Sequence, residues 1–211
     1  MEFRELLPRR RMVRHYGPEP VSREVVERIV STIRRAPSAG YSQGQRLLVV
    51  ISDEGRAAVS RCFEASGGGS GEGLEPWLES APVHVLVCTR EDDYHDRYRR
   101  PDKLDEEGHE IDWPVPYWFV DAGAALMLLL LAAIDEGLGA AVSGVPRDVA
   151  ASLGEAFDMP GDLAAVALVT MGVAAPDPGW SAVTSRRTRP RRRQGELVHW
   201  ERFAPESPDA A

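Results

Sequence analysis

Residues 118–139 read WFVDAGAALMLLLLAAIDEGLG, and this stretch decides the fold. It consists mainly of alanine, leucine and methionine, which are strong helix formers. A helix without a polar face is either buried in protein or spans a membrane. Asp121 and Asp135 bound an apolar run that is shorter than the roughly 20 residues a bilayer requires. We therefore predict a buried central helix that ends at Gly137 and Gly139, with the same helix of a second subunit as one candidate packing partner.

Composition narrows the class of protein. The chain has 211 residues, which suits a single domain; we place it at residues 1–203 and predict a disordered tail at 204–211. The net charge of -8 argues against nucleic acid as a partner. Cys62 and Cys88 form no CxxC motif, so we expect no metal site and a reduced, cytoplasmic protein. The charged N-terminus does not resemble a signal peptide, and we expect no membrane partner.

The remaining pattern mixes helices with short buried strands. Helical signals cover residues 22–35, 53–65 and 146–157, with shorter ones at 1–7 and 74–80. Apolar runs predict strands at residues 47–51, 83–88 and 165–173. We expect a flexible loop at 67–73, an irregular segment at 91–115 and a short extended tail at 197–203.

Two arginine clusters lie at opposite ends of the chain. Arg10, Arg11 and Arg14 surround Met12 in an irregular segment, and closely spaced arginines can converge on one phosphate. The alternative is a solvated basic surface. The second cluster, within residues 186–193, fits half of an anion site, a solvated linker or a nucleic-acid tail; the acidic net charge weakens the last of these.

The loop APSAGYSQ, residues 36–43, offers backbone N–H groups and short hydroxyls to a ligand edge. Its alternative interpretation is a turn that ends the preceding helix. The sequence contains no GxSxG and no HExxH motif, and its histidines are scattered. Without a protein nucleophile or a metal, any chemistry would come from an organic cofactor.

Taken together and in order, five segments resemble the FMN-dependent nitroreductase family. RRRMVRHYGPEPVSREVVERIV resembles its opening motif, and APSAGYSQG its A-P-S-x-x-N-x-Q-P-W motif. YWFVDAGAALMLLLLAAIDEGLGAAVSGV resembles its central helix and the turn after it. VALVTMGVAAP and RRRQGELVHWERF resemble its late strand and its basic ending, so the resemblance covers about residues 5–203.

This resemblance implies a homodimer of α+β subunits, each with a mixed or antiparallel sheet flanked by helices and a swapped C-terminal segment. Two FMN molecules are expected in the dimer interface. Arg10, Arg11, Met12 through its backbone, and Arg14 would hold the phosphate and ribityl chain, and Arg191 and Arg192 would close on the phosphate. Pro37, Ser38, Ala39, Tyr41 and Gln43 would reach the flavin from the other subunit, whereas Ser143 and Gly144 would lie against the isoalloxazine.

By the same resemblance, NADH or NADPH reduces FMN at N5, and the reduced flavin passes the hydride to a nitroaromatic, quinone or enone. Tyr94, Tyr98 and Trp113 are candidates for the substrate wall, with a solvated loop as the alternative. Met12 and Tyr41 replace a serine and an asparagine of the family pattern. These departures motivate an alternative function, a flavin-sequestering protein without catalysis. A third reading, a relative that consumes reduced flavin with oxygen, is weakened because Met12 stands where that branch has an acidic residue.

Overall fold

The structure is a computed structural model that describes residues 2–65, 77–176 and 191–203. Contacts divide the chain into two units, Met1–Pro176 and Asp177–Ala211. The predicted loop at 67–73, the start of the predicted helix at 74–80 and the predicted disordered tail lie outside the described residues. The first unit holds every strand of the sheet described below, and its α+β architecture confirms the predicted fold class.

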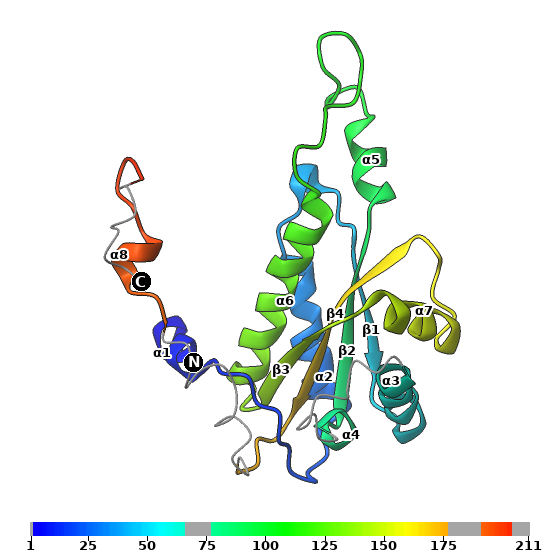
Figure 1. The fold of residues 1–211 in the computed structure, drawn as a ribbon, viewed down its shortest axis with the longest axis vertical. Coiled ribbons are helices and arrows are strands. Elements are labelled where there is room, and N and C mark those ends of the chain that lie inside the picture. The colour runs from blue at the N-terminus through cyan, green and yellow to red at the C-terminus, as the bar shows by residue number, and fades with distance from the viewer. Residues whose placement is uncertain (1, 66–76, 177–190, 204–211) are drawn as a thin grey trace. The chain divides into compact units, whose positions relative to one another are not determined.

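A four-stranded antiparallel sheet forms the centre of the first unit (Figure 1). Its strands are β1 (Gln45–Val50), β2 (Val83–Arg90), β3 (Gly139–Gly144) and β4 (Leu163–Gly172), in the order β1-β2-β4-β3. The register shifts between Val87 and Cys88, where β2 pairs with β4. The predicted strands at 47–51, 83–88 and 165–173 correspond to β1, β2 and β4.

Helices cover both faces of the sheet, which explains why β2 is buried at every position except Arg90. Helices α2 (Arg23–Ser31) and α6 (Tyr117–Asp135) pack on one face, and α3 (Asp53–Ala65) and α7 (Arg147–Ala156) pack on the other. Val85 and Val87 point to the first face, whereas Leu86 and Cys88 point to the second. This alternation follows the period of two that a strand imposes.

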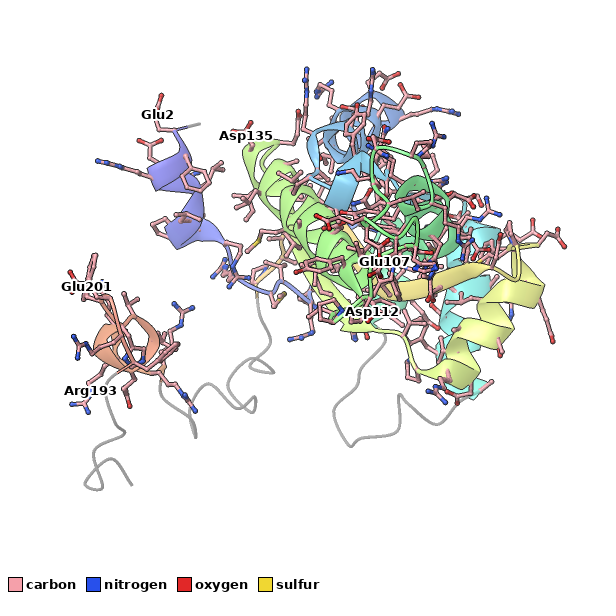
Figure 2. The ribbon with its side chains drawn as sticks, turned by 90° about the horizontal axis from the view of Figure 1, so that it is seen from above. Glu2, Glu107, Asp112, Asp135, Arg193 and Glu201 are labelled. Carbon is pink, nitrogen blue, oxygen red and sulfur yellow. The ribbon has the colours of Figure 1, made fainter. Side chains whose placement is uncertain are left out.

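The central helix α6 confirms the helix predicted from the opening stretch. Gly137 ends it with φ 80, in the left-handed region that glycine adopts at little cost. Its length and apolar composition would allow it to cross a membrane, but its buried residues share one core with α2 and the sheet. Asp135 marks its C-terminal end in Figure 2. Burial is incomplete within one chain, because Val120 is 52% exposed and Met127 is 42% exposed.

Several short elements complete the described chain. They are α1 (Phe3–Arg9), the 3-10 helices η1 (Thr32–Arg35) and η2 (Ala39–Tyr41), α4 (Trp77–Ser80) and α8 (Gln194–Leu197). Two boundaries differ from the sequence prediction. Pro8 lies inside α1 instead of ending it, and Leu197 is helical instead of extended.

Two elements were missed by the sequence prediction. The strand β3 reads GAAVSG, and its small residues have little preference for strands. The segment 91–115 is not irregular throughout, because it begins with helix α5 (Asp92–Tyr98). Glu110 holds the loop that follows: its carboxylate accepts from Trp113 Nε1 at 2.7 Å and from Arg99 Nε at 3.0 Å, and lies 2.5 Å from His95 Nδ1.

His84 on β2 gives the fold a pH dependence. It is fully buried, and its Nε2 lies 2.8 Å from the Leu78 carbonyl oxygen, to which it donates in the neutral ring. Burial lowers the pKa of His84 from 6.5 to about 4, and the Arg56 charge adds to this effect. Because the unfolded chain binds the proton more tightly, this contribution to stability is complete above pH 6.5 and is lost as the pH falls toward 4.

We therefore predict that His84 lowers the free energy of unfolding by about 3 kcal/mol between pH 7 and pH 4. Urea unfolding at several pH values measures this change. His84→Gln should unfold with a shallower pH dependence than the parent chain in this window. His109→Gln, at a side chain that is 75% exposed, is the control for the loss of a surface histidine. Equal slopes for the parent and His84→Gln would contradict the assignment.

Candidate functional site

The N-terminal segment around Met12 lies alongside the first half of β3. Met12 forms a parallel bridge with Ala140, and the Val13 N–H donates to the Ala140 carbonyl at 2.9 Å. Gly139 permits this approach, because a Cβ there would lie 2.7 Å from Val13 Cγ1. Farther along, the buried Tyr16 bonds through its hydroxyl to the Val13 carbonyl at 2.6 Å. The backbone that carries the first arginine cluster is therefore fixed on the sheet.

The described residues give Arg10, Arg11 and Arg14 no ion pair with a carboxylate. Arg11 and Arg14 are exposed, and Arg10 is half-buried. In residues 2–65 and 77–176, the arginines that form ion pairs or side-chain hydrogen bonds are different ones, namely Arg23, Arg28, Arg46, Arg56, Arg90, Arg97 and Arg99. Arg14 does lie over the buried Trp77 ring, with its Cζ 5.8 Å from the ring centroid. Three cations on a fixed backbone, with no carboxylate partner in residues 2–65, 77–176 and 191–203, suit a phosphate.

Ser143 and Gly144 stand at the other end of the same strand. Ser143 is half-buried, and Gly144 is exposed with nothing within 4 Å of the position that a Cβ would take. Ser143 comes three residues after Ala140, so about 10 Å of strand separates it from the bridge to Met12. One end of β3 thus lies beside the arginine cluster, and the other end has an open backbone at Gly144. A ligand with a phosphate joined to a flat ring by a short chain requires two such regions.

The loop 37–43 is held by α5 and α6. The Ala39 N–H donates to Asp121 Oδ2 at 2.8 Å, and Arg97 Nε donates to the Gly40 carbonyl at 2.9 Å. Tyr41 is 76% exposed and Gln43 is also exposed, and both adopt left-handed φ values of 61 and 55. Such conformations cost non-glycine residues roughly 1–2 kcal/mol each, so the surrounding bonds must maintain them. Pro37 is exposed, and Ser38 and Ala39 are half-buried.

The three aromatic residues predicted for a substrate wall belong to one cluster. The rings of Tyr98 and Trp113 lie 4.5 Å apart between centroids, and both residues are half-buried. Tyr94 is fully buried, and its hydroxyl donates to Asp121 Oδ2 at 2.9 Å. Of the three predicted wall residues, Tyr98 and Trp113 are partly accessible, whereas Tyr94 is buried with its ring centroid 6.3 Å from that of Trp113.

Arg191 and Arg192 are exposed and lie in the second unit, in the segment that Arg193 and Glu201 mark in Figure 2. Their closure on a phosphate stays a prediction. Sequence analysis missed the role of Asp121, which it used only to mark one end of the apolar run. The signal for a buried role was present, because Asp121 is a lone carboxylate inside an apolar run.

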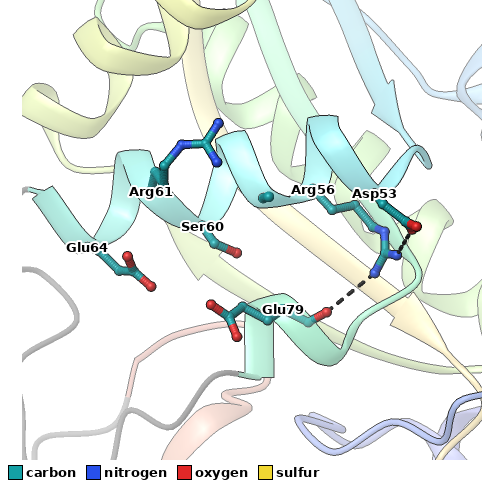
Figure 3. Close-up of a pocket in the computed structure, with 7 residues that line it drawn as sticks. Asp53, Arg56, Ser60, Arg61, Glu64 and Glu79 are labelled. Atoms are coloured by element: carbon teal, nitrogen blue, oxygen red, sulfur yellow. Dashed lines mark hydrogen bonds and ion pairs between the residues drawn. The ribbon is translucent and has the colours of Figure 1, made fainter.

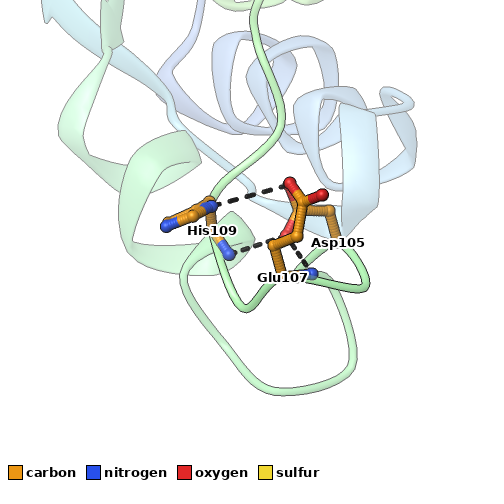
Figure 4. A group of neighbouring side chains, drawn as sticks. All are labelled: Asp105, Glu107 and His109. Atoms are coloured by element: carbon orange, nitrogen blue, oxygen red, sulfur yellow. Dashed lines mark hydrogen bonds and ion pairs between the residues drawn. The ribbon is translucent and has the colours of Figure 1, made fainter.

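Two further polar features lie elsewhere in the first unit. A cavity of about 260 Å³ opens between α3 and α4 (Figure 3), and Arg56 on its wall already donates to the carbonyls of Glu79 at 3.3 Å and Ala81 at 3.1 Å. Asp105, Glu107 and His109 form an exposed group (Figure 4). The Asp105 carboxylate accepts from the backbone N–H groups of Glu107 at 3.0 Å and His109 at 2.8 Å, so it shapes a turn.

Comparison with known proteins gives the same family over most of the first unit. The family model described as "Nitroreductase family" matches residues 7–173. The chain is 30% identical over 157 residues to the FMN reductase [NAD(P)H] of Bacillus subtilis (strain 168), a match covering 71% of this chain and 57% of that protein. It is 31% identical over 100 residues to the 5,6-dimethylbenzimidazole synthase of Rhodobacter capsulatus, covering 42% of this chain and 48% of that protein.

The chain therefore spans about half the length of these two relatives. Among solved structures, a nitroreductase family protein from Clostridium difficile 630 superposes with a TM-score of 0.67 at 24% identity, covering 96% of this chain and 100% of that one. That likeness concerns the fold alone. The family match extends from the first helix to the end of β4 and includes the basic segment, the loop 37–43 and β3. This chain belongs to the nitroreductase family.

Proposed function

We propose that the protein is an FMN-dependent oxidoreductase that takes a hydride from NADH or NADPH and passes it to an electron-poor acceptor such as a nitroaromatic, a quinone or an enone. Family membership and the name of the Bacillus subtilis relative support this proposal. The observation that carries it is the placement of Arg10, Arg11 and Arg14 at one end of β3, with Ser143 and Gly144 at the other.

The residues of this chain supply binding and orientation. The arginines neutralise a dianionic phosphate, and the backbone around Met12 adds a fixed edge. Gly144 lets a flat ring approach the β3 backbone, because no side chain stands there. Bound FMN supplies the two-electron chemistry, accepting a hydride and then releasing it. The backbone N–H of the exposed Gly144, which the alternation of β3 directs away from β4, would favour negative charge on the ring, which is a common role of backbone donors in flavin sites.

We infer that the active form is a homodimer joined along α6. Val120, Gly123 and Met127 are exposed and recur at helical spacing, so they form one apolar stripe on the side of α6 that faces away from the core. Phe119, 45% exposed, extends the same apolar surface. A second copy of this helix would cover the stripe. In this arrangement the loop 37–43 and the arginines 191 and 192 serve a site shared between subunits.

The absorbance spectrum of the purified protein tests the activity. We expect a yellow protein, or a colourless one that takes up added FMN with a change in flavin fluorescence. Under nitrogen, NADH or NADPH should bleach the visible flavin band, and a quinone should restore it. Absence of any FMN binding would overturn the proposal.

A different outcome of that experiment would favour the second candidate, a flavin-sequestering protein. In that case the chain binds FMN, but neither nicotinamide bleaches it. The observation behind this candidate is Tyr41, which is 76% exposed where the family pattern has an asparagine, together with Met12 in place of a serine.

Arg14→Ala or Arg10→Ala should weaken FMN binding by about 1.5–3 kcal/mol, the usual range for one hydrogen bond to a charged group. Fluorescence titration of the apoprotein with FMN measures the change. Arg61→Ala is the control, since Arg61 is an exposed arginine on α3, on the opposite face of the sheet from α6. An affinity for FMN that is unchanged in Arg14→Ala and Arg10→Ala would count against the phosphate site.

Met127→Glu should separate the dimer, because it places a charge in an apolar helix contact. Analytical ultracentrifugation of the parent chain should report two copies, and Met127→Glu should shift the distribution to one copy with loss of bound FMN. Ile51→Glu is the control, as Ile51 is 41% exposed in the turn between β1 and α3. A parent chain that sediments as a monomer while binding FMN would contradict the shared site.

A further inference from the structure

One acidic side chain, Asp121, is buried among the described residues. It lies in the second turn of α6, it is 7% exposed, and no other acidic side chain in residues 2–65, 77–176 and 191–203 is buried. Its Oδ2 accepts two hydrogen bonds, one from the Ala39 N–H at 2.8 Å and one from the Tyr94 hydroxyl at 2.9 Å. Bonds of this kind, to an ionised acceptor, are about twice as strong as neutral ones. Removing the acceptor would leave two donors without a partner.

The two donors come from two different elements. Ala39 begins η2, in the loop that carries the left-handed residues Gly40, Tyr41 and Gln43. Tyr94 belongs to α5, which opens the segment 91–115. Burial raises the pKa of Tyr94, and the bond to Asp121 raises it further, so its hydroxyl keeps its proton and remains a donor throughout the neutral range.

The loop and α5 also contact one another closely. A Cβ on Gly40 would lie 2.5 Å from the Tyr98 ring, and a Cβ on Gly44 would lie 2.4 Å from the Tyr94 ring. Arg97 adds the bond from its Nε to the Gly40 carbonyl. The packing therefore leaves no room between the loop and α5, and the two can be treated as one body.

We propose that Asp121 is a positioning residue that sets the flavin loop 37–43 and helix α5 together, so that the edge offered to FMN and the wall offered to the acceptor shift as one. This inference rests on the proposed function for the roles of the two surfaces, but the mechanical coupling does not depend on flavin. The physical reason is that one carboxylate oxygen holds both elements to the start of α6. A weaker acceptor at Asp121 would therefore weaken the hydrogen bonds to both elements together.

Amide hydrogen exchange on the full-length protein without added FMN tests the coupling. We expect Asp121→Asn to raise exchange about tenfold in both segments 38–44 and 92–98, because a neutral oxygen replaces the ionised one. Tyr94→Phe, which removes one donor, should raise exchange in the same two segments. Residues 147–156 of α7, on the other face of the sheet, should keep their protection. Asp96→Asn is the matched control, an exposed aspartate on α5 itself. A rise in only one segment, or in neither, overturns the coupling.

The functional consequence is tested with the flavin-loaded protein and p-benzoquinone as acceptor. Asp121→Asn and Tyr94→Phe should raise both the Kd for FMN and the KM for the quinone, while kcat at saturating flavin and quinone stays within about twofold. Increased exchange in both segments with unchanged Kd and KM would reduce Asp121 to a structural role and overturn the proposal. If the parent chain binds no FMN, the proposed function fails, whereas the exchange result still decides the coupling.

Discussion

The packing of α6 against the sheet is the constraint on which the rest of the structure depends. The face that meets the sheet carries Ala122, Ala125, Leu129 and Ala133, all with no measurable exposure. Because three of these four are alanines, the helix axis can approach the strands closely, and the larger valines of β2 fill the space between. On the opposite face, Val120 and Met127 remain exposed in the part of the chain that the structure describes. The exposed apolar side chains of Val120 and Met127 therefore still need a packing partner, and a second copy of the chain can provide it.

Much of this architecture could be predicted from local pattern. The central helix is long and apolar, and β2 is rich in valine, so the type of each element is clear from the sequence. Ser22 marks the start of α2 by accepting from the Val25 N–H at 3.4 Å. β3 could not be recognised in the same way, because glycine, alanine and serine become a strand there only through pairing with β4. The polar helix α5 was missed for a related reason. Its own Tyr94 packs against Trp118, and the helix contacts the loop 37–43, which lies about fifty residues earlier, so distant residues stabilise it.

The candidate site, too, could be predicted only in part from the sequence. The arginines around Met12 and the open residues at the end of β3 are visible in the sequence as charge and as small residues. Their alignment along one strand is not, since it depends on the bridge between Met12 and Ala140. Asp121 is the clearest case. Its two partners lie on segments that are far apart in the sequence, so a residue that appears only to bound an apolar run is the point where three elements meet. Only a structure can reveal a convergence of this kind.

The two borders of the sheet have a consequence for behaviour at high concentration. An edge strand with free N–H and C=O groups pairs readily with another chain and can begin a fibre. At the β3 border, the Val13 N–H already occupies the Ala140 carbonyl. At the β1 border, the exposed Arg46 bonds to the Gln43 carbonyl at 2.7 Å and to Asp93 at 2.8 Å, and it holds a charge beside the strand. Pairing between the edge strands of different molecules is discouraged at both borders, so crowding should not lead readily to fibres.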